Sequence, residues 1–387
     1  MALNRPGETD QRKQLRIEVG QWALFALLFL AAGFWLLQAE WDRLYAGVWL
    51  LLAGGVTVYQ FVFLWQNLDE NRSEGEPGIV YATLGPANQI TIVRAVLTAA
   101  LAGFLPGPWP QGWLGWAPGV LYLLVAVLDF VDGFVARITG RTTRLGALLD
   151  MKWDGAGVLI GAALAVRYGQ APFWFLLVAM ARFIFLFGEW LLRRRGAPLY
   201  ELDQSMIRRA LAGMQMGFIG VVLLPVFTPP TTLVAATLFM LPFMTHFLRD
   251  FLWVSGKIGP QAAGRDAGVL RAQRLLRAWL PLGLRLVQFL LLADLLIEQR
   301  RAGFSQIGMV IVALVALPAF IMGAAGRLAA LAVLFLAGIA LQSTPLHWLY
   351  WLMLLNSTLL FIFGTGRFSI WKPEDWLIHH RAGEARQ

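Results

Sequence analysis

Four aspartates interrupt two long apolar runs between positions 129 and 154, where an ionised group is costly unless its surroundings compensate it. The first two, Asp129 and Asp132, are three residues apart and share one helix face. Asp150 and Asp154, four residues apart, share a face in the same way. The basic segment 138–145 can turn the chain back and bring the two pairs opposite each other. Four converging carboxylates suit hard divalent cations such as Mg²⁺ or Mn²⁺.

Small residues lie on the same turns as the first acid pair. Gly133 and Ala136 leave little bulk there, so a ligand can approach the helix backbone closely. The alternative is an inert ion-pair cluster, in which the acids pair with three nearby arginines: Arg137, Arg141 and Arg144.

Composition restricts the class of protein. A chain of 387 residues with 58% hydrophobic residues, 14% charged residues and a mean hydropathy of +0.62 lies far outside the soluble range. The net charge of +9 comes from Lys and Arg clustered at the ends of apolar runs, as the positive-inside pattern predicts. We therefore expect anionic lipids and phosphate-bearing substrates as partners, and no nucleic acid. The chain has no cysteine, which excludes disulfides and thiolate metal ligands.

Apolar runs of membrane-spanning length recur along the chain. They are expected at about 19–38, 46–65, 86–105, 120–136, 145–166, 173–192, 210–227, 232–253, 280–297, 307–325, 328–341 and 346–363. The first run lacks a convincing cleavage site, so we expect a retained anchor. Segment 66–85 has the composition of a linker. A second connector, 256–277, ends in a basic amphipathic helix at 269–277, which should lie at the membrane surface.

The acidic stretch also resembles a known family. Its pattern, D-x2-D-G-x2-A-R-x8-G-x3-D-x3-D, matches every fixed position of the CDP-alcohol phosphotransferase signature. Ahead of it, Asn88, Thr91 and Arg94 resemble the Asn-x-x-Thr-x-x-Arg pattern of the family's first core helix, which lies beside the nucleotide pocket. The resemblance covers roughly residues 86–255.

The fold class predicted is an all-α polytopic membrane protein. The resemblance implies a six-helix CDP-alcohol phosphotransferase core at 67–256. Two extra helices precede it at 1–66, and about four follow at 257–387. The stretch 364–372 resembles DoxX-like four-helix membrane domains. This second resemblance implies no chemical activity.

The resemblance also assigns roles to residues. It implies two bound ions, Mg²⁺ or Mn²⁺. Their ligands are Asp129, Asp132 and Asp150, with Asp154 as a shared ligand. Asp154 is the general base that deprotonates the acceptor hydroxyl. The nucleotide-binding positions are Asn88, Thr91, Asp129, Gly133, Ala136, Arg137 and Gly146.

The reaction implied is transfer of a phosphatidyl group from CDP-diacylglycerol to a cytosolic polar alcohol, of the glycerol 3-phosphate or inositol type, with release of CMP. We expect direct in-line transfer without a covalent enzyme intermediate. The candidates for binding a phosphorylated acceptor are Arg144, Lys152, Arg182, Arg193 and Arg208. Arginines at helix ends are also routine topology signals, so the sequence leaves open which of these bind.

Other functions stay open at this point. The family also contains enzymes that transfer from CDP-choline or CDP-ethanolamine to diacylglycerol. Intramembrane acids also mark transporters and proton relays, and the outer spans could form an interaction module. The basic loops, such as 138–145 and 193–209, predict that both termini and the acidic site face the cytoplasm. Family resemblance suggests a homodimer.

Overall fold

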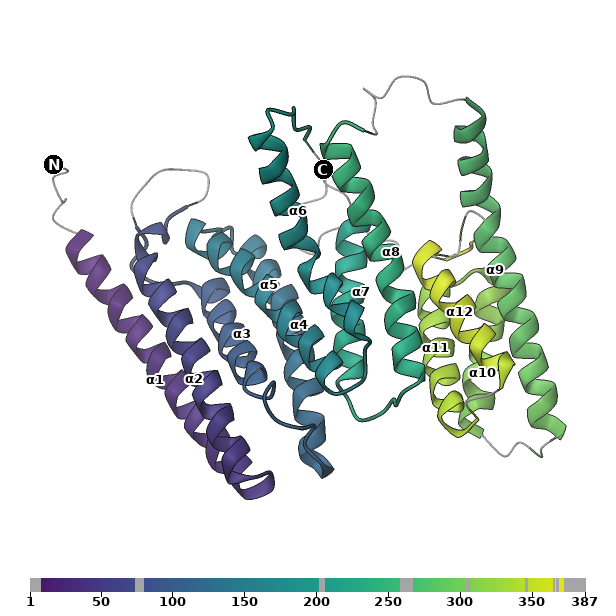
Figure 1. Cartoon of the computed structure of the whole chain (residues 1–387), viewed down its shortest axis with the longest axis horizontal. Coiled ribbons are helices and arrows are strands. Elements are labelled where there is room, and N and C mark those ends of the chain that lie inside the picture. The colour runs from purple at the N-terminus through teal and green to yellow at the C-terminus, as the bar shows by residue number, and fades with distance from the viewer. Residues whose placement is uncertain are drawn as a thin grey trace. The chain divides into compact units, whose positions relative to one another are not determined.

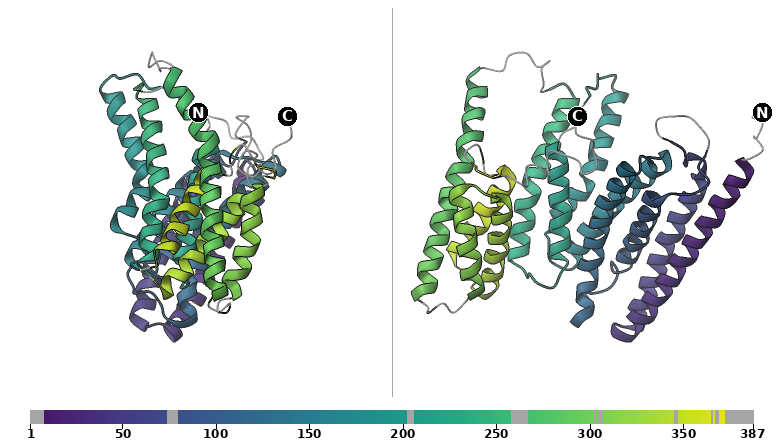
Figure 2. Two further views of the ribbon diagram at one scale, coloured as in Figure 1. Left: turned by 90° about the vertical axis from the view of Figure 1, so that its right-hand side faces the viewer. Right: turned by 180° about the vertical axis from the view of Figure 1, so that it is seen from behind.

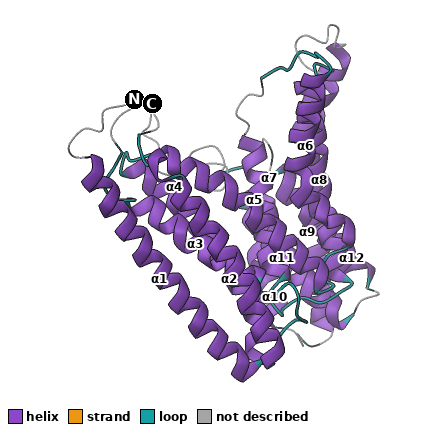
Figure 3. Cartoon of the chain, turned by 60° about the vertical axis from the view of Figure 1, so that its left-hand side comes forward, coloured by secondary structure: helices purple, strands orange, loops and turns teal. Residues whose placement is uncertain are grey.

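The computed structural model describes residues 8–73, 80–201, 206–257, 267–301, 303, 307–344, 347–364, 366 and 369–371. Throughout this part the chain forms helices joined by loops, and no strand is present (Figure 3). The predicted all-α class is confirmed. Six described helices are long and apolar enough to cross a membrane, and four shorter ones are also apolar. The protein is therefore an integral membrane protein.

Expectations on some segments fall outside this part. They concern positions 74–79 of the expected linker, 258–266 of the second connector, part of the DoxX-like stretch and the C-terminal tail from 372.

The chain divides into two compact units. The first contains residues 8–179 and 216–225, and the second contains the remaining described residues. The helices of the first unit are α1 (Glu8–Glu40), α2 (Arg43–Gln66), η1 (Leu68–Glu70), α3 (Pro86–Ala102), η2 (Gly112–Trp116), α4 (Ala117–Ile138), α5 (Arg144–Arg167) and η3 (Phe173–Phe175). Helix α6 (Leu176–Arg194) begins in this unit, and α7 (Met206–Val222) ends in it.

Local sequence signals explain where the helices of the first unit begin. The Asp42 side chain accepts from the Leu44 amide at 2.8 Å and caps α2. Pro86 occupies the first turn of α3, where its missing amide proton costs nothing. Gly140, with φ +62°, lies in the turn after α4, and the Thr143 hydroxyl caps α5. The acid-bearing helices therefore start and stop where the sequence predicts.

Helix α3 is the centre of the first unit, because it packs against α2, α4 and α5. Helices α1 and α2 run alongside each other in both views (Figures 1 and 2). A core of buried side chains joins all of these except α4, and it includes Leu15, Leu64, Ile92, Leu149 and Trp153. Both N-terminal helices thus pack onto the helices that carry the polar site.

The second unit contains α8 (Thr231–Val254), α9 (Ala267–Arg301), α10 (Ile307–Met322), α11 (Gly326–Ser343) and α12 (Trp348–Phe363). Helices α9 to α12 pack on one another around a common apolar core (Figure 1). Segment 269–277 is helical, as predicted, and is continuous with the span that follows it. Within this unit the buried Arg285 guanidinium donates to the carbonyls of Phe320 and Ile321, at 2.8 and 2.7 Å.

Candidate active site

The end of α4 and the start of α5 bring the predicted acids together. Asp129 and Asp132 lie on α4, and Asp150 lies on α5. Each of the three offers a carboxylate oxygen, and these oxygens all lie within 4.8 Å of one another. Asp132 is buried, whereas the other two are partly exposed. The predicted turn between the helices therefore produces the predicted convergence.

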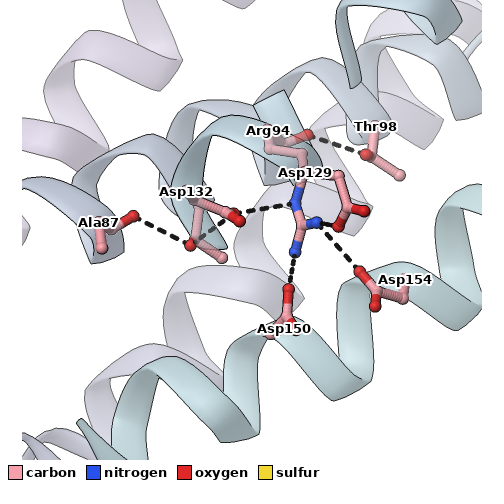
Figure 4. A network of polar contacts seen from close by, with 8 residues as sticks. Ala87, Arg94, Thr98, Asp129, Asp132, Asp150 and Asp154 are labelled. Carbon is pink, nitrogen blue, oxygen red and sulfur yellow. Dashed lines mark hydrogen bonds and ion pairs between the residues drawn. The ribbon is translucent and has the colours of Figure 1, made fainter. Parts of the chain in front are cut away.

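One arginine lies among all four carboxylates (Figure 4). Arg94 comes from α3 and is 2% exposed. Its Nη1 contacts Asp129 and also lies 3.0 Å from Asp154 Oδ1. Its Nη2 donates to Asp150 Oδ1 at 2.8 Å, and its Nε lies 3.6 Å from Asp132 Oδ2.

The four carboxylates carry more charge than Arg94 can neutralise. Taken with Arg94 alone, they have a formal charge of −3 when all are ionised. Like charges this close favour the binding of further cations or the uptake of protons. Clustered carboxylate oxygens are the donor set that Mg²⁺ and Mn²⁺ prefer. The residues present therefore fit a divalent metal.

A second polar cluster lies at the N-terminal ends of α3 and α5. Thr91 donates to Asp132 Oδ2 at 2.9 Å and links this end to the acids. One turn earlier, Asn88 Nδ2 lies 3.0 Å from Thr143 Oγ1, and Thr143 accepts from the Gly146 amide at 2.9 Å. Asn88 lies directly over Gly146, since a Cβ at position 146 would be 2.6 Å from Asn88 Oδ1.

The other predicted nucleotide residues lie on the last turns of α4. The Arg137 guanidinium folds back over Gly133, 3.2 Å from where a Cβ would be at that position. Ala136 is partly buried on the same helix. Nothing observed assigns a ligand to these residues, so their nucleotide role stays a prediction.

The candidate acceptor residues are divided between the two units. The Lys152 ammonium lies over the rings of Phe63 and Tyr59 on α2, at 3.5 and 4.9 Å from their centroids. Arg144 is exposed at the start of α5, and its amide donates to the Arg72 carbonyl at 3.0 Å. The remaining three, Arg182, Arg193 and Arg208, belong to the second unit. Their acceptor role also stays a prediction.

Arg94 is the site residue that sequence reasoning undervalued. The pattern Asn-x-x-Thr-x-x-Arg ends in Arg94 but gives this arginine no role of its own. The available signal was an arginine within an apolar helix, which needs acidic partners to be tolerated there. Only the packing of α3 against α4 and α5 identifies those partners as the four aspartates.

The acid motif and the helices around it correspond to a known family. Residues 85–248 match the CDP-alcohol phosphatidyltransferase family. The chain contains a CDP-alcohol phosphatidyltransferase domain. This domain begins just before α3 and includes all four aspartates and Arg94.

Relatives of this domain carry different names. A CDP-diacylglycerol–glycerol-3-phosphate 3-phosphatidyltransferase of Cereibacter sphaeroides is 31% identical over 35% of this chain and 62% of its own length. A phosphatidylinositol phosphate synthase of Corynebacterium glutamicum is 46% identical over 19% of this chain and 33% of its own. Choline/ethanolaminephosphotransferase 2 of Arabidopsis thaliana is 32% identical over 25% of this chain and 28% of its own length. The chain thus spans less than two thirds of each relative. No solved structure gives a significant match.

Proposed function

We propose that the protein transfers a phosphatidyl group from CDP-diacylglycerol to the hydroxyl of a polar, phosphorylated alcohol and releases CMP. The observation that carries this proposal is the convergence of three carboxylates, with oxygens within 4.8 Å, inside a CDP-alcohol phosphatidyltransferase domain. Support for the acceptor class comes from the bacterial relatives, which are named for glycerol 3-phosphate and for phosphatidylinositol phosphate.

The proposed step is one displacement at phosphorus. The acceptor oxygen bonds to the phosphorus that carries the diacylglycerol, and the bond from that phosphorus to the CMP oxygen breaks. Asp154 takes the hydroxyl proton, because an alcohol is too weak an acid to ionise alone near pH 7. Its side chain is 39% exposed, so an acceptor can reach it. Transfer is direct, and trapping of a phosphoryl-enzyme after quenching would contradict it.

The metal ligands of the proposal are Asp129, Asp132 and Asp150, with Asp154 shared. Mg²⁺ or Mn²⁺ bound there, two ions in all, would neutralise the pyrophosphate and stabilise the departing CMP oxygen. Arg94 holds the acids of both helices together from the buried side. Thr91 fixes the carboxylate of Asp132 by its hydrogen bond.

The proposed location is the cytoplasmic face of a membrane. The acids lie at the C-terminal end of α4 and the N-terminal end of α5, next to the basic turn 138–145. Such basic segments stay in the cytoplasm, where a soluble acceptor is available. A homodimer remains a prediction.

The experiment that tests this function measures CMP release by the purified protein in detergent or lipid with Mg²⁺ or Mn²⁺. CDP-diacylglycerol is offered with glycerol 3-phosphate, inositol, inositol phosphate and serine, and Asp154→Asn is run beside the wild type. We expect release that depends on one acceptor and falls by about 10²–10⁴-fold in the variant, as for loss of a general base. Release unaffected by the acceptor or by the substitution would contradict the proposal.

A second candidate is transfer of phosphocholine or phosphoethanolamine from the CDP-alcohol to diacylglycerol. It is favoured by the Arabidopsis relative, which is named for that activity. The same assay decides between the two, with CDP-choline or CDP-ethanolamine as donor and diacylglycerol as acceptor. A transporter or proton relay is less supported, because the four acids gather around one arginine and are not spread along the helices. Cation binding without CMP release from any donor would favour transport.

A further inference from the structure

We infer that the chain N-terminal to the matched domain supplies a positioning residue, Asn71, for the nucleotide end of the active site. The inference rests on the proposed function. Asn71 precedes residue 85, where the family match begins, and it lies in the stretch whose composition is that of a linker. Its side chain is nevertheless 0% exposed. A buried amide must have its polar atoms paired, so the partners of Asn71 indicate what it holds.

The Asn71 amide uses both its donors and its oxygen. Nδ2 donates to the carbonyls of Tyr81 and Thr83, at 3.1 and 2.9 Å. Oδ1 accepts from Asn88 Nδ2 at 3.3 Å. The backbone carbonyl of Asn71 also accepts from the Tyr81 amide at 2.8 Å. Asn71 therefore fixes residues 81–83, which lead into α3, and at the same time contacts a predicted nucleotide residue.

Asn88 passes this contact on to α5. The same Nδ2 lies 3.0 Å from Thr143 Oγ1 and 3.0 Å from the Leu84 carbonyl, and Thr143 caps the helix at Gly146. Helix α5 carries Asp150 and Asp154. A continuous hydrogen-bonded series thus runs from Asn71 through Asn88 and Thr143 to the first turn of an acid-bearing helix.

Other residues that precede the matched domain, which we call the extension (8–73 and 80–84), strengthen the same attachment. The Arg72 carbonyl accepts from the Arg144 amide at 3.0 Å, and Ser73 forms an antiparallel bridge with Thr143. On α1, Glu18 accepts from the Leu84 amide and from Gln89 Nε2, both at 2.8 Å. The extension thereby holds the N-terminal ends of both α3 and α5.

This geometry predicts which kinetic quantity depends on Asn71. Loss of its side chain removes a donor from the Tyr81 and Thr83 carbonyls, of which Thr83 keeps Arg141 as a donor. It also removes one of the three acceptors around Asn88 Nδ2. The acids keep their own ties through Arg94, which does not involve Asn71. Nucleotide binding should weaken, and the chemical step should be preserved.

The test compares Asn71→Ala with Asn67→Ala. Asn67 is a matched control, because its Nδ2 donates to the Phe63 carbonyl within its own turn at 2.8 Å. CDP binding is measured by calorimetry in detergent with Mg²⁺, and KM and kcat are measured with CDP-diacylglycerol. We expect Asn71→Ala to weaken CDP binding and raise KM by about tenfold, as for one lost hydrogen bond in a buried site, with kcat within about twofold. Asn67→Ala should resemble the wild type.

A double variant tests whether Asn71 acts by positioning Asn88 or only by stabilising the loop that leads into α3. If Asn71 acts through Asn88, the Asn71→Ala/Asn88→Ala double variant binds CDP as weakly as Asn88→Ala alone. The inference would be overturned if the two substitutions weakened CDP binding by factors that multiply in the double variant. It would also be overturned if kcat fell in proportion to the amount of folded protein. Unchanged CDP binding by a folded Asn71→Ala protein would overturn it too.

Two further results of these experiments also test the inference. If Asn71→Ala does not fold, Asn71→Ser replaces it, because a hydroxyl can still donate to one of the two carbonyls. Weakening of CDP binding by about threefold or more then supports the inference, and a smaller change overturns it. A wild-type protein that binds CDP but releases no CMP refutes the proposed function alone, and one that binds no CDP refutes both.

Discussion

The Arg94 guanidinium on α3 donates a 2.8 Å hydrogen bond to Asp150 on α5 and contacts Asp129 on α4 through its other amino group. One cation therefore ties the two acidic helices to a third. Arg94 is 2% exposed, whereas the Asp150 and Asp154 side chains are 50% and 39% exposed. The cation therefore lies on the buried side of the cluster, and the Asp150 and Asp154 side chains stay partly exposed.

Substitution of this arginine should lower both stability and activity. Arg94→Gln leaves four carboxylates without their internal cation, and removal of one partner from a buried ion pair costs about 3 kcal/mol or more. We expect the thermal midpoint to fall and CMP release to be lost. Saturating Mg²⁺ should recover more of the midpoint in Arg94→Gln than in the wild type, since metal then supplies the missing positive charge. An equal response of both proteins to Mg²⁺ would contradict a shared electrostatic role.

Metal affinity should depend on the three aspartates whose oxygens converge. We expect Asp129→Asn, Asp132→Asn and Asp150→Asn each to weaken Mn²⁺ binding by tenfold or more, about 1.4 kcal/mol, because each removes one carboxylate ligand. Asp154→Asn should weaken it less, since Asp154 is outside that set of three. Electron paramagnetic resonance titration of Mn²⁺ measures this without turnover. Equal losses in all four variants would place Asp154 among the essential ligands.

The first turn of α5 should not accept a side chain at Gly146. In Gly146→Ala the new Cβ would lie 2.6 Å from Asn88 Oδ1, so the Asn88 amide must move. We expect KM for CDP-diacylglycerol to rise by about tenfold, equivalent to 1.4 kcal/mol, with a smaller change in kcat. The control is Gly157→Ala on the same helix, where the Cβ would meet Val125 at an ordinary 3.8 Å. If both variants behave alike, Asn88 does not need its position over Gly146.

A packing position deeper in the first unit gives a prediction about stability alone. Gly161 of α5 lies against the ring of Tyr122, which is 0% exposed, and against Ile219. Gly161→Ala should destabilise the protein by about 1–3 kcal/mol, because overpacking forces the ring to shift. Gly54→Ala on α2, whose Cβ would meet nothing within 4 Å, should be neutral or slightly stabilising. Thermal unfolding in detergent measures both.

The sequence predicted that the aspartates converge, because the relevant relationships are local. Spacings of three and four residues place Asp129 with Asp132, and Asp150 with Asp154, on one face of a helix whatever surrounds them. A short basic turn with a glycine constrains how the two helices meet, and Gly140 adopts the positive φ that this turn requires. Hydropathy likewise predicted the helices, since an apolar run in a membrane must satisfy its backbone internally.

Other features depended on contacts between distant segments. Arg94 and Asp150 are far apart in the sequence, and only the packing of α3 on α5 pairs them. Lys152 lies between two acids in sequence, yet its ammonium lies over aromatic rings of α2, because positions 150 and 152 point to different sides of a helix.

The sequence by itself determined the all-helical membrane architecture and the four aspartates, because hydropathy and helical periodicity act over a few turns. Only the tertiary structure decided that one buried arginine lies among all four acids. It alone brought Asn71, from a stretch with the composition of a linker, into contact with Asn88. A buried polar group is tolerated only with partners, and the fold, not the local sequence, supplies them.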